Sequence, residues 1–81
     1  MLFYTLEQRV ASYLLEESQR LETDTIQVTQ EQLAQAIGSA REAVTRTLKK
    51  LSAAETVELF RGGVRIRDRK GLERLVERGG L

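Results

Sequence analysis

The N-terminal part of the chain has hydrophobic residues at the spacing of an amphipathic helix. Its apolar positions recur every three or four residues, at Leu6, Val10, Tyr13 and Leu14. Residues at this spacing share one face of a helix, so the pattern predicts a helix over about residues 5–19. Thr5 and Gln8 have the spacing of a capping box and are expected to begin it.

The pattern then changes from helical spacing to alternation. The β-branched, alternating segment 25–28 predicts a short strand. Thr29 and Gln32 form a second predicted capping box, which begins another helix. The buried face of that helix is expected to consist of Leu33, Ala34 and Ile37. Gly38 should end it, because helices often finish in a left-handed residue and glycine adopts that conformation without strain.

A third helix is predicted over residues 40–54, and its two faces differ in chemistry. Ser39 is expected to cap it, with Glu42 as the reciprocal partner. One side of the helix is apolar and carries Ala43, Val44, Thr47, Leu48, Leu51 and Ala54. The opposite arc, roughly 140° wide, carries Arg41, Glu42, Thr45, Arg46 and Lys49. One face can therefore pack on a core, while the other offers groups that hydrogen-bond to base edges and phosphates.

Two alternating segments around a glycine pair follow this helix. Residues 57–60 and 64–67 flank Arg61-Gly62-Gly63, and this arrangement predicts a β-hairpin. Asp68 is expected to cap a last short helix. The apolar side of that helix consists of Leu72, Leu75 and Val76. Two short helices joined by a glycine turn, followed by a hairpin, predict a winged helix-turn-helix: a mainly α fold with a three-helix core and a small β-wing.

The length of the chain predicts one small domain, residues 1–81, and its composition lacks most of the usual catalytic groups. It has no cysteine and no histidine, so disulfides, thiolate metal sites and the commonest general base are excluded. Glu16 and Glu17 are adjacent on a helix and point in different directions, and Gly62-Gly63 lacks the remainder of a phosphate-binding loop. No enzyme is expected. No apolar segment is long enough to span a membrane, and a cytoplasmic location is expected.

Net charge is +1, but its distribution is uneven. Residues 1–40 hold two basic and six acidic side chains, whereas residues 41–81 hold eleven basic and six acidic ones. Such asymmetry is typical of a surface that binds a polyanion, although small domains also divide their charge unevenly by chance. The four aromatic residues have core-like spacings, which disfavours single-strand binding by base stacking: Phe3, Tyr4, Tyr13 and Phe60.

Segment 29–38, followed by the pattern Arg41-Glu42-x-Val44-x-Arg46-x-Leu48-x-x-Leu51, resembles the DNA-binding domain of the cyclic-AMP receptor and fumarate–nitrate regulator (Crp–Fnr) family. The resemblance extends through the predicted wing to Asp68 and the helix after it. It implies sequence-specific binding of double-stranded DNA, with helix 40–54 in the major groove. Arg41 and Arg46 would then donate to guanine O6 and N7, and Glu42 would accept from a cytosine amino group.

The resemblance also implies contacts to the DNA backbone. These would come from the start of the second helix, the turn, the reading helix and the wing tip: Thr29, Gln30, Ser39, Thr45, Lys49, Arg61 and Gly62. Three positions depart from the family pattern. Ala40 and Ala43 each replace a common hydroxyl residue. Glu55 replaces a glycine that closes the reading helix, so the chain either adopts a strained left-handed residue there or ends the helix differently.

Family members carry a sensor region and a dimerisation helix before such a domain. We therefore expect this chain to be the excised C-terminal part of a longer regulator. The effector would bind the sensor domain, with no cofactor in this domain. The resemblance implies that the full-length protein acts as a homodimer on a pseudo-palindromic site, and it alone implies contact with RNA polymerase.

Several alternatives remain open from the sequence. The same fold could serve as a protein–protein adaptor, which would more often expose apolar anchors on the third helix. The chain could also belong to another family of winged-helix regulators. Arg67, Arg69 and Lys70 are as compatible with a solvated sheet edge as with phosphate contacts.

Overall fold

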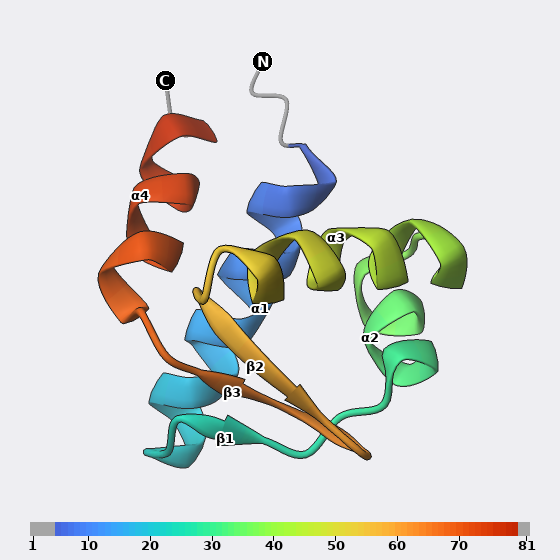
Figure 1. Cartoon of the computed structure of the whole chain (residues 1–81), viewed down its shortest axis with the longest axis horizontal. Helices are drawn as coiled ribbons and strands as arrows, with labels where there is room; N and C mark the ends of the chain where they lie inside the picture. Colours follow the sequence, from blue (N-terminus) through green and yellow to red (C-terminus); the bar gives the residue numbers. More distant parts are fainter. Residues whose placement is uncertain (1–4, 80–81) are drawn as a thin grey trace.

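The computed structural model describes residues 5–79. In this part of the chain it contains four helices and three strands, shown in Figure 1. In chain order these are α1 (Leu6–Leu21), β1 (Thr25–Ile26), α2 (Gln30–Ile37), α3 (Arg41–Ala53), β2 (Val57–Phe60), β3 (Gly63–Ile66) and α4 (Arg69–Gly79). Phe3 and Tyr4, for which core-like positions are predicted, lie outside the described residues. The order of elements and the winged helix-turn-helix architecture are as the sequence predicts.

The three strands form one antiparallel sheet in the order β1-β3-β2. β2 and β3 make the predicted hairpin, in which Leu59 pairs with Val64 and Phe60 with Gly63. β1 adds a third strand, with Ile26 opposite Val64. The predicted strand 25–28 ends at Ile26, because the chain must leave the sheet before Thr29 begins α2.

The hydrophobic core lies between the helices and the inner face of the sheet. Fully buried side chains come from α1, α2, α3 and the strands, among them Leu14, Leu33, Leu48, Ile26 and Val57. Leu72 of α4 is also completely buried, and α4 packs along α1. The fourth helix therefore completes the core that the sequence assigned to three helices.

The predicted helix caps at Thr5, Thr29 and Asp68 are confirmed. Thr5 Oγ1 accepts from the Gln8 backbone amide at 3.2 Å, and the Thr5 backbone amide donates to Oε1 of Gln8 at 2.7 Å. Thr29 and Gln32 repeat this capping box at 3.0 and 2.9 Å. Asp68 accepts from the Gly71 amide at 3.1 Å. These local bonds satisfy amide groups that the first helical turn would otherwise leave unpaired.

The predicted cap at Ser39 is wrong. Ala40 is the N-cap of α3, and it makes no side-chain capping bond. The reason lies in the end of α2, where Gly38 is left-handed with φ of 69°. The Gly38 amide donates to Gln35 at 3.3 Å and the Ser39 amide to Ala34 at 2.9 Å. This double closure uses Ser39 to terminate α2, so α3 starts after Ala40.

Glu55 adopts the strained alternative among the two that the sequence left open. Its φ is 60°, and it follows the last turn of α3. The Glu55 amide donates to Ser52 and the Thr56 amide to Leu51, both at 2.9 Å. A left-handed conformation costs an L-residue roughly 1–2 kcal/mol, and the two closing bonds hold it in place. α3 therefore passes directly into the wing.

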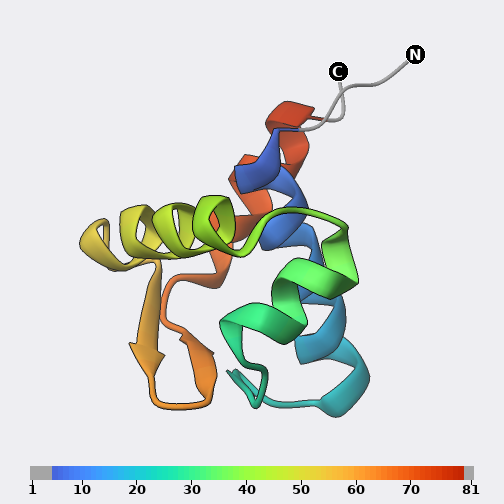
Figure 2. The same cartoon turned by 90° about the vertical axis from the view of Figure 1, so that its right-hand side faces the viewer.

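Figure 2 shows the wing beside the helix-turn-helix, with its tip near the start of α2. Both ends of the described chain lie on the other side of the molecule, at the top of the view. Among residues 5–79 no helix is long and apolar enough to cross a membrane.

Candidate nucleic-acid interface

The outer face of α3 carries a row of exposed charged side chains. Its members are Arg41, Glu42, Arg46 and Lys49. The opposite face of the same helix buries Val44, Leu48 and Leu51 in the core. The helix is thus divided as its sequence predicts, and its polar face is left available for an external partner.

The cations of this row take no part in the ion pairs found between residues 5 and 79. The same holds for Arg61 at the wing tip. Lys50, the residue after Lys49, instead binds Glu7 of α1 at 3.0 Å. The row and the wing tip therefore present positive charge that is not neutralised within the described fold, as an anionic ligand requires.

A groove of roughly 380 Å³ lies between the start of α2, the first residue of α3 and the wing tip. Predicted site residues from all three places line it: Thr29, Gln30, Arg41, Arg61 and Gly62. The fold therefore brings together residues that are more than 30 positions apart in the chain. One carboxylate, that of Glu31, lines the same groove as the two guanidinium groups. We name these lining residues, together with the exposed row of α3, the reading surface.

Two residues predicted to contact phosphates, Gln30 of α2 and Thr45 of α3, are hydrogen-bonded to each other. The Thr45 hydroxyl donates to Oε1 of Gln30, and both side chains are half-buried. Ser39 is also half-buried, in the turn. Thr29 is exposed, and its Oγ1 is the acceptor in the capping bond, so that bond does not use its hydroxyl hydrogen. The half-buried members of the predicted site are therefore Gln30, Ser39 and Thr45, and the other members are exposed.

Phe60 lies on the surface, and its predicted core position is wrong. Phe60 is 42% exposed and lines the groove beside Arg61. The cause is the pairing register, which places Phe60 and Glu58 on the outer face while Val57 points into the core. The alternating pattern of residues 57–60 fits this orientation, because Phe60 lies two positions after the charged residue Glu58 and therefore on the same face of the strand.

The ring of Phe60 covers the backbone of Gly63. A Cβ atom at Gly63 would lie 2.4 Å from Cζ of Phe60 and 2.7 Å from the carbonyl oxygen of Ile26. Position 63 therefore requires glycine for lack of space. Gly62 has φ of 83°, a conformation that glycine adopts without strain. The two glycines of the wing serve different purposes.

The arginines that follow the wing have different partners. Arg69 binds Asp24 at 2.7 Å and also donates to the buried hydroxyl of Ser18. It therefore fastens the start of α4 to the end of α1, and neither of its two predicted alternatives describes it. Arg67 and Lys70 are exposed, so both of their interpretations stay open.

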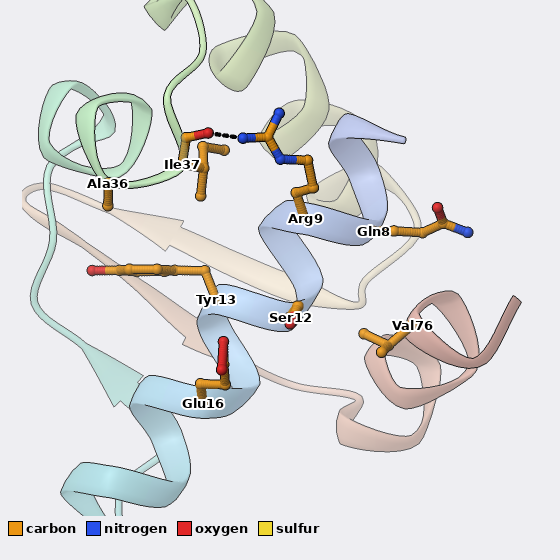
Figure 3. Close-up of a pocket in the computed structure, with 8 residues that line it drawn as sticks. All are labelled: Gln8, Arg9, Ser12, Tyr13, Glu16, Ala36, Ile37 and Val76. Atoms are coloured by element: carbon orange, nitrogen blue, oxygen red, sulfur yellow. Dashed lines mark hydrogen bonds between the residues drawn. The ribbon is translucent and has the colours of Figure 1, made fainter. Parts of the chain in front are cut away.

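A second hollow, of roughly 330 Å³, lies between α1, the end of α2 and α4, and Figure 3 shows its lining. None of the predicted site residues lines it. Arg9 donates to the carbonyl of Ile37, the last residue of α2. Burial raises the pKa of Tyr13, and the nearby charge of Glu17 raises it further. The guanidinium group of Arg9, which lines this hollow, is therefore already bonded to the backbone, and this indicates a structural role for Arg9.

Comparison with known proteins gives one consistent result. The family model of the Crp-like helix-turn-helix domain matches residues 8–75. A protein from Eubacterium rectale assigned to the Crp/Fnr family of transcriptional regulators is 41% identical, with a TM-score of 0.87 over 90% of this chain and 34% of that one. A Crp/Fnr-family transcriptional regulator from Thermus thermophilus is 31% identical, with a TM-score of 0.85 over 91% of this chain and 41% of that one.

The catabolite activator protein of Thermus thermophilus is also 31% identical, with a TM-score of 0.81 over 88% of this chain and 33% of that one. The chain thus spans between a third and about two fifths of the length of these structures. No curated protein matches it. These results decide between the Crp–Fnr family and other winged-helix families in favour of the former.

Proposed function

This chain belongs to the Crp–Fnr family of DNA-binding transcription regulators, and on that premise we propose that it binds double-stranded DNA sequence-specifically with α3 in the major groove. Arg41 and Arg46 donate to guanine O6 and N7, and Glu42 accepts from a cytosine amino group. The exposure of all three side chains on one helix face supports these roles. The proposal assigns binding, and no catalysis, to this chain.

Phosphate contacts flank the base-reading side chains in this proposal. The groove holds one DNA strand between Thr29 and Gln30 on one side and Arg61 and Gly62 on the other. Lys49 contacts a phosphate further along α3. Contacts of this kind set the register of the protein on DNA, and their strength depends on salt because each cation releases counterions.

The observation that carries the proposal is the chemistry of the outer face of α3. An adaptor would present large apolar anchors there. Among the described residues the exposed large hydrophobic side chains are Leu21 and Phe60, and neither belongs to α3. The face instead presents arginine, glutamate and lysine, the residue types that read bases and grip phosphates.

For the longer protein we propose the architecture that the family resemblance implies. An effector-binding sensor domain and a dimerisation helix accompany this domain, which itself holds no cofactor. The homodimer binds a pseudo-palindromic site with G·C-containing half-sites, and contacts RNA polymerase. Two linked domains gain about 10²–10⁴ in affinity over one, so the isolated chain should bind a single half-site weakly.

An NMR titration of the labelled 81-residue chain tests the proposal. The titrants are a short G·C-rich half-site duplex and a scrambled duplex of equal length, both at low salt. We expect saturable shifts centred on Arg41, Glu42 and Arg46, with a second group at the wing tip, and weaker effects from the scrambled duplex. Shifts centred on another surface, or none, would contradict DNA reading and direct attention to an adaptor role.

A further inference from the structure

Two threonine hydroxyls in α3 have different partners. Thr47 Oγ1 donates to the carbonyl of Ala43 at 3.0 Å, within its own helix. Thr45 Oγ1 donates to Oε1 of Gln30, the first residue of α2. The Thr45 bond therefore joins the two helices of the helix-turn-helix, whereas the Thr47 bond does not. The two residues form a natural pair for comparison.

The bond from Thr45 gives the amide of Gln30 a defined polarity. A glutamine amide has one acceptor oxygen and one NH₂ group with two donor hydrogens. Because the oxygen accepts from Thr45, it is directed toward α3, and the NH₂ group occupies the other branch of the same planar amide. Gln30 also lines the groove that contains Arg41 and Arg61. Its donor group is thus the branch left for a ligand in that groove.

This polarity is the one that a phosphate requires. Phosphodiester oxygens only accept hydrogen bonds, so an amide that presented its oxygen would repel them, whereas an amide that presents its NH₂ group can donate to them. An unrestrained glutamine would also lose rotamer freedom when it bound. The hydroxyl of Thr45 both selects the favourable orientation and reduces that entropy loss.

We propose that Thr45 is a positioning residue that holds the Gln30 amide with its NH₂ group toward a DNA phosphate. The inference rests on the proposed function and deepens it. It replaces a direct phosphate contact by Thr45 with an indirect one. Gln30 contacts the phosphate, and Thr45 acts only through Gln30.

Three variants test the hydroxyl. Thr45→Val removes the donor and keeps the branched shape, Thr45→Ser keeps the donor, and Thr47→Val is the matched control. We expect Thr45→Val to weaken binding about three- to tenfold, the range for loss of one hydrogen bond. The loss should be equal on the half-site and scrambled duplexes, because phosphates carry no sequence. Thr45→Ser and Thr47→Val should bind like the wild type. An equal loss in Thr47→Val would overturn the proposal.

A double-mutant cycle with Gln30→Ala separates indirect from direct action. If Thr45 acts through Gln30, Thr45→Val should cause no further loss of affinity in the Gln30→Ala background. The salt dependence should stay unchanged in each variant, because a neutral amide releases no counterion. Losses that multiply in the double variant would mean that Thr45 contacts DNA independently, and would overturn the proposal.

The free protein provides a readout that needs no DNA. Nitrogen-15 relaxation of the Gln30 side-chain amide should report an ordered group in the wild type and Thr45→Ser, and a mobile one in Thr45→Val. Equal mobility in all three would overturn the inference alone. A wild-type chain that binds neither duplex would overturn the proposed function, and with it this inference. A wild type that binds while Thr45→Val binds equally well would overturn only the inference.

Discussion

The reading surface differs in ion pairing from the opposite side of the molecule, which is formed by α1, α4 and the turn before β1. On the latter side, which we call the support side, three arginines form ion pairs: Arg69 with Asp24 at 2.7 Å, Arg20 with Glu17 at 2.8 Å and Arg74 with Asp68 at 3.8 Å. On the reading surface, Arg41, Arg46 and Arg61 form no such pair within the described residues. Ion-paired arginines are therefore found on the support side and not on the reading surface of the described chain.

The pair between Arg20 and Glu17 shows what intramolecular partners do. Its hydrogen bond lowers the pKa of Glu17 and raises that of Arg20, so each stabilises the charged form of the other. Pairs as exposed as this one add little to folding, because water and salt screen them. Apolar packing therefore provides most of the stability of the support side.

Lys49 and Lys50 illustrate the contrast within a single helix. They are adjacent in sequence and both exposed, but about 100° apart around the helix axis. Lys50 faces α1 and binds Glu7, while Lys49 belongs to the exposed row. Identical side chains one position apart thus have different environments because of helical geometry alone.

The largest expected effect comes from the buried face of α3. Leu48 is fully buried, so Leu48→Ala removes packing and leaves a cavity that should cost about 2–5 kcal/mol of unfolding free energy. Thermal or urea unfolding followed by circular dichroism measures this loss. Arg46→Ala, two residues earlier on the exposed face, is the control and should leave stability nearly unchanged. Similar losses in both variants would contradict the division of α3 into two faces.

The next effect concerns the wing. Gly63→Ala forces a Cβ against the Phe60 ring and the Ile26 carbonyl, and should destabilise the domain by about 1–3 kcal/mol, typical of overpacking. The unfolding midpoint measures this change. Adding Phe60→Leu should recover only part of the loss, because the carbonyl contact remains. An unchanged midpoint in Gly63→Ala would mean that β1 and the wing do not pack as closely as described.

A loss limited to specific DNA is expected for Arg46→Ala. Removal of a bidentate contact to guanine should cost about 1–3 kcal/mol on the half-site and much less on scrambled DNA. Fluorescence anisotropy with both duplexes measures the difference. Arg74→Ala removes the same charge from α4 on the support side, and should bind like the wild type. An equal loss on both duplexes would exclude a base-reading role for Arg46.

The two lysines test the comparison through salt dependence. Lys49→Ala should weaken binding to all sequences and reduce the slope of log affinity against log salt by about one. Lys50→Ala should leave that slope unchanged, since its ammonium group is held by Glu7. Titrations at several salt concentrations measure both slopes. Equal reductions of the slope in the two variants would mean that an ion pair with α1 does not keep a lysine of α3 from contacting DNA.

The smallest expected effect is at the junction between α3 and the wing. Glu55→Gly relieves the left-handed strain at φ of 60° but adds chain entropy to the unfolded state. We expect a net gain of up to about 1 kcal/mol in unfolding free energy. Glu55→Ala, which keeps the Cβ atom, should give no such gain. If both variants were equally stabilised, removal of the carboxylate, and not relief of strain, would be the cause.

Local interactions made much of the fold predictable from sequence. The capping boxes at Thr5 and Thr29, the left-handed Gly38 and the two faces of α3 each depend on residues within a few positions of one another. Helical periodicity placed Arg41, Glu42, Arg46 and Lys49 on the exposed face for the same reason. The exposed row of the reading surface is therefore visible in the chain before any fold is known.

Contacts between distant parts of the chain decided the rest. β1 finds its partner β3 about forty residues later, and Arg69 finds Asp24 and Ser18 across a similar separation. No pattern in a short window specifies such pairings, because they depend on how the elements pack. Phe60 is an intermediate case. Its predicted core position was wrong although the alternation of residues 57–60 fits its outward face, and only strand pairing decides which glycine its ring covers.

In the turn between α2 and α3, the local sequence pattern and the observed hydrogen bonds disagree. The sequence presented Ser39 as a cap by its spacing from Glu42, but the closing bonds of α2 use the Ser39 backbone first. The sequence by itself determined which residues could form helices and which faces could be polar, because those properties depend on neighbours along the chain. Only the tertiary structure decided which polar groups are satisfied internally and which remain for an external ligand, because that depends on what each side chain contacts across the fold.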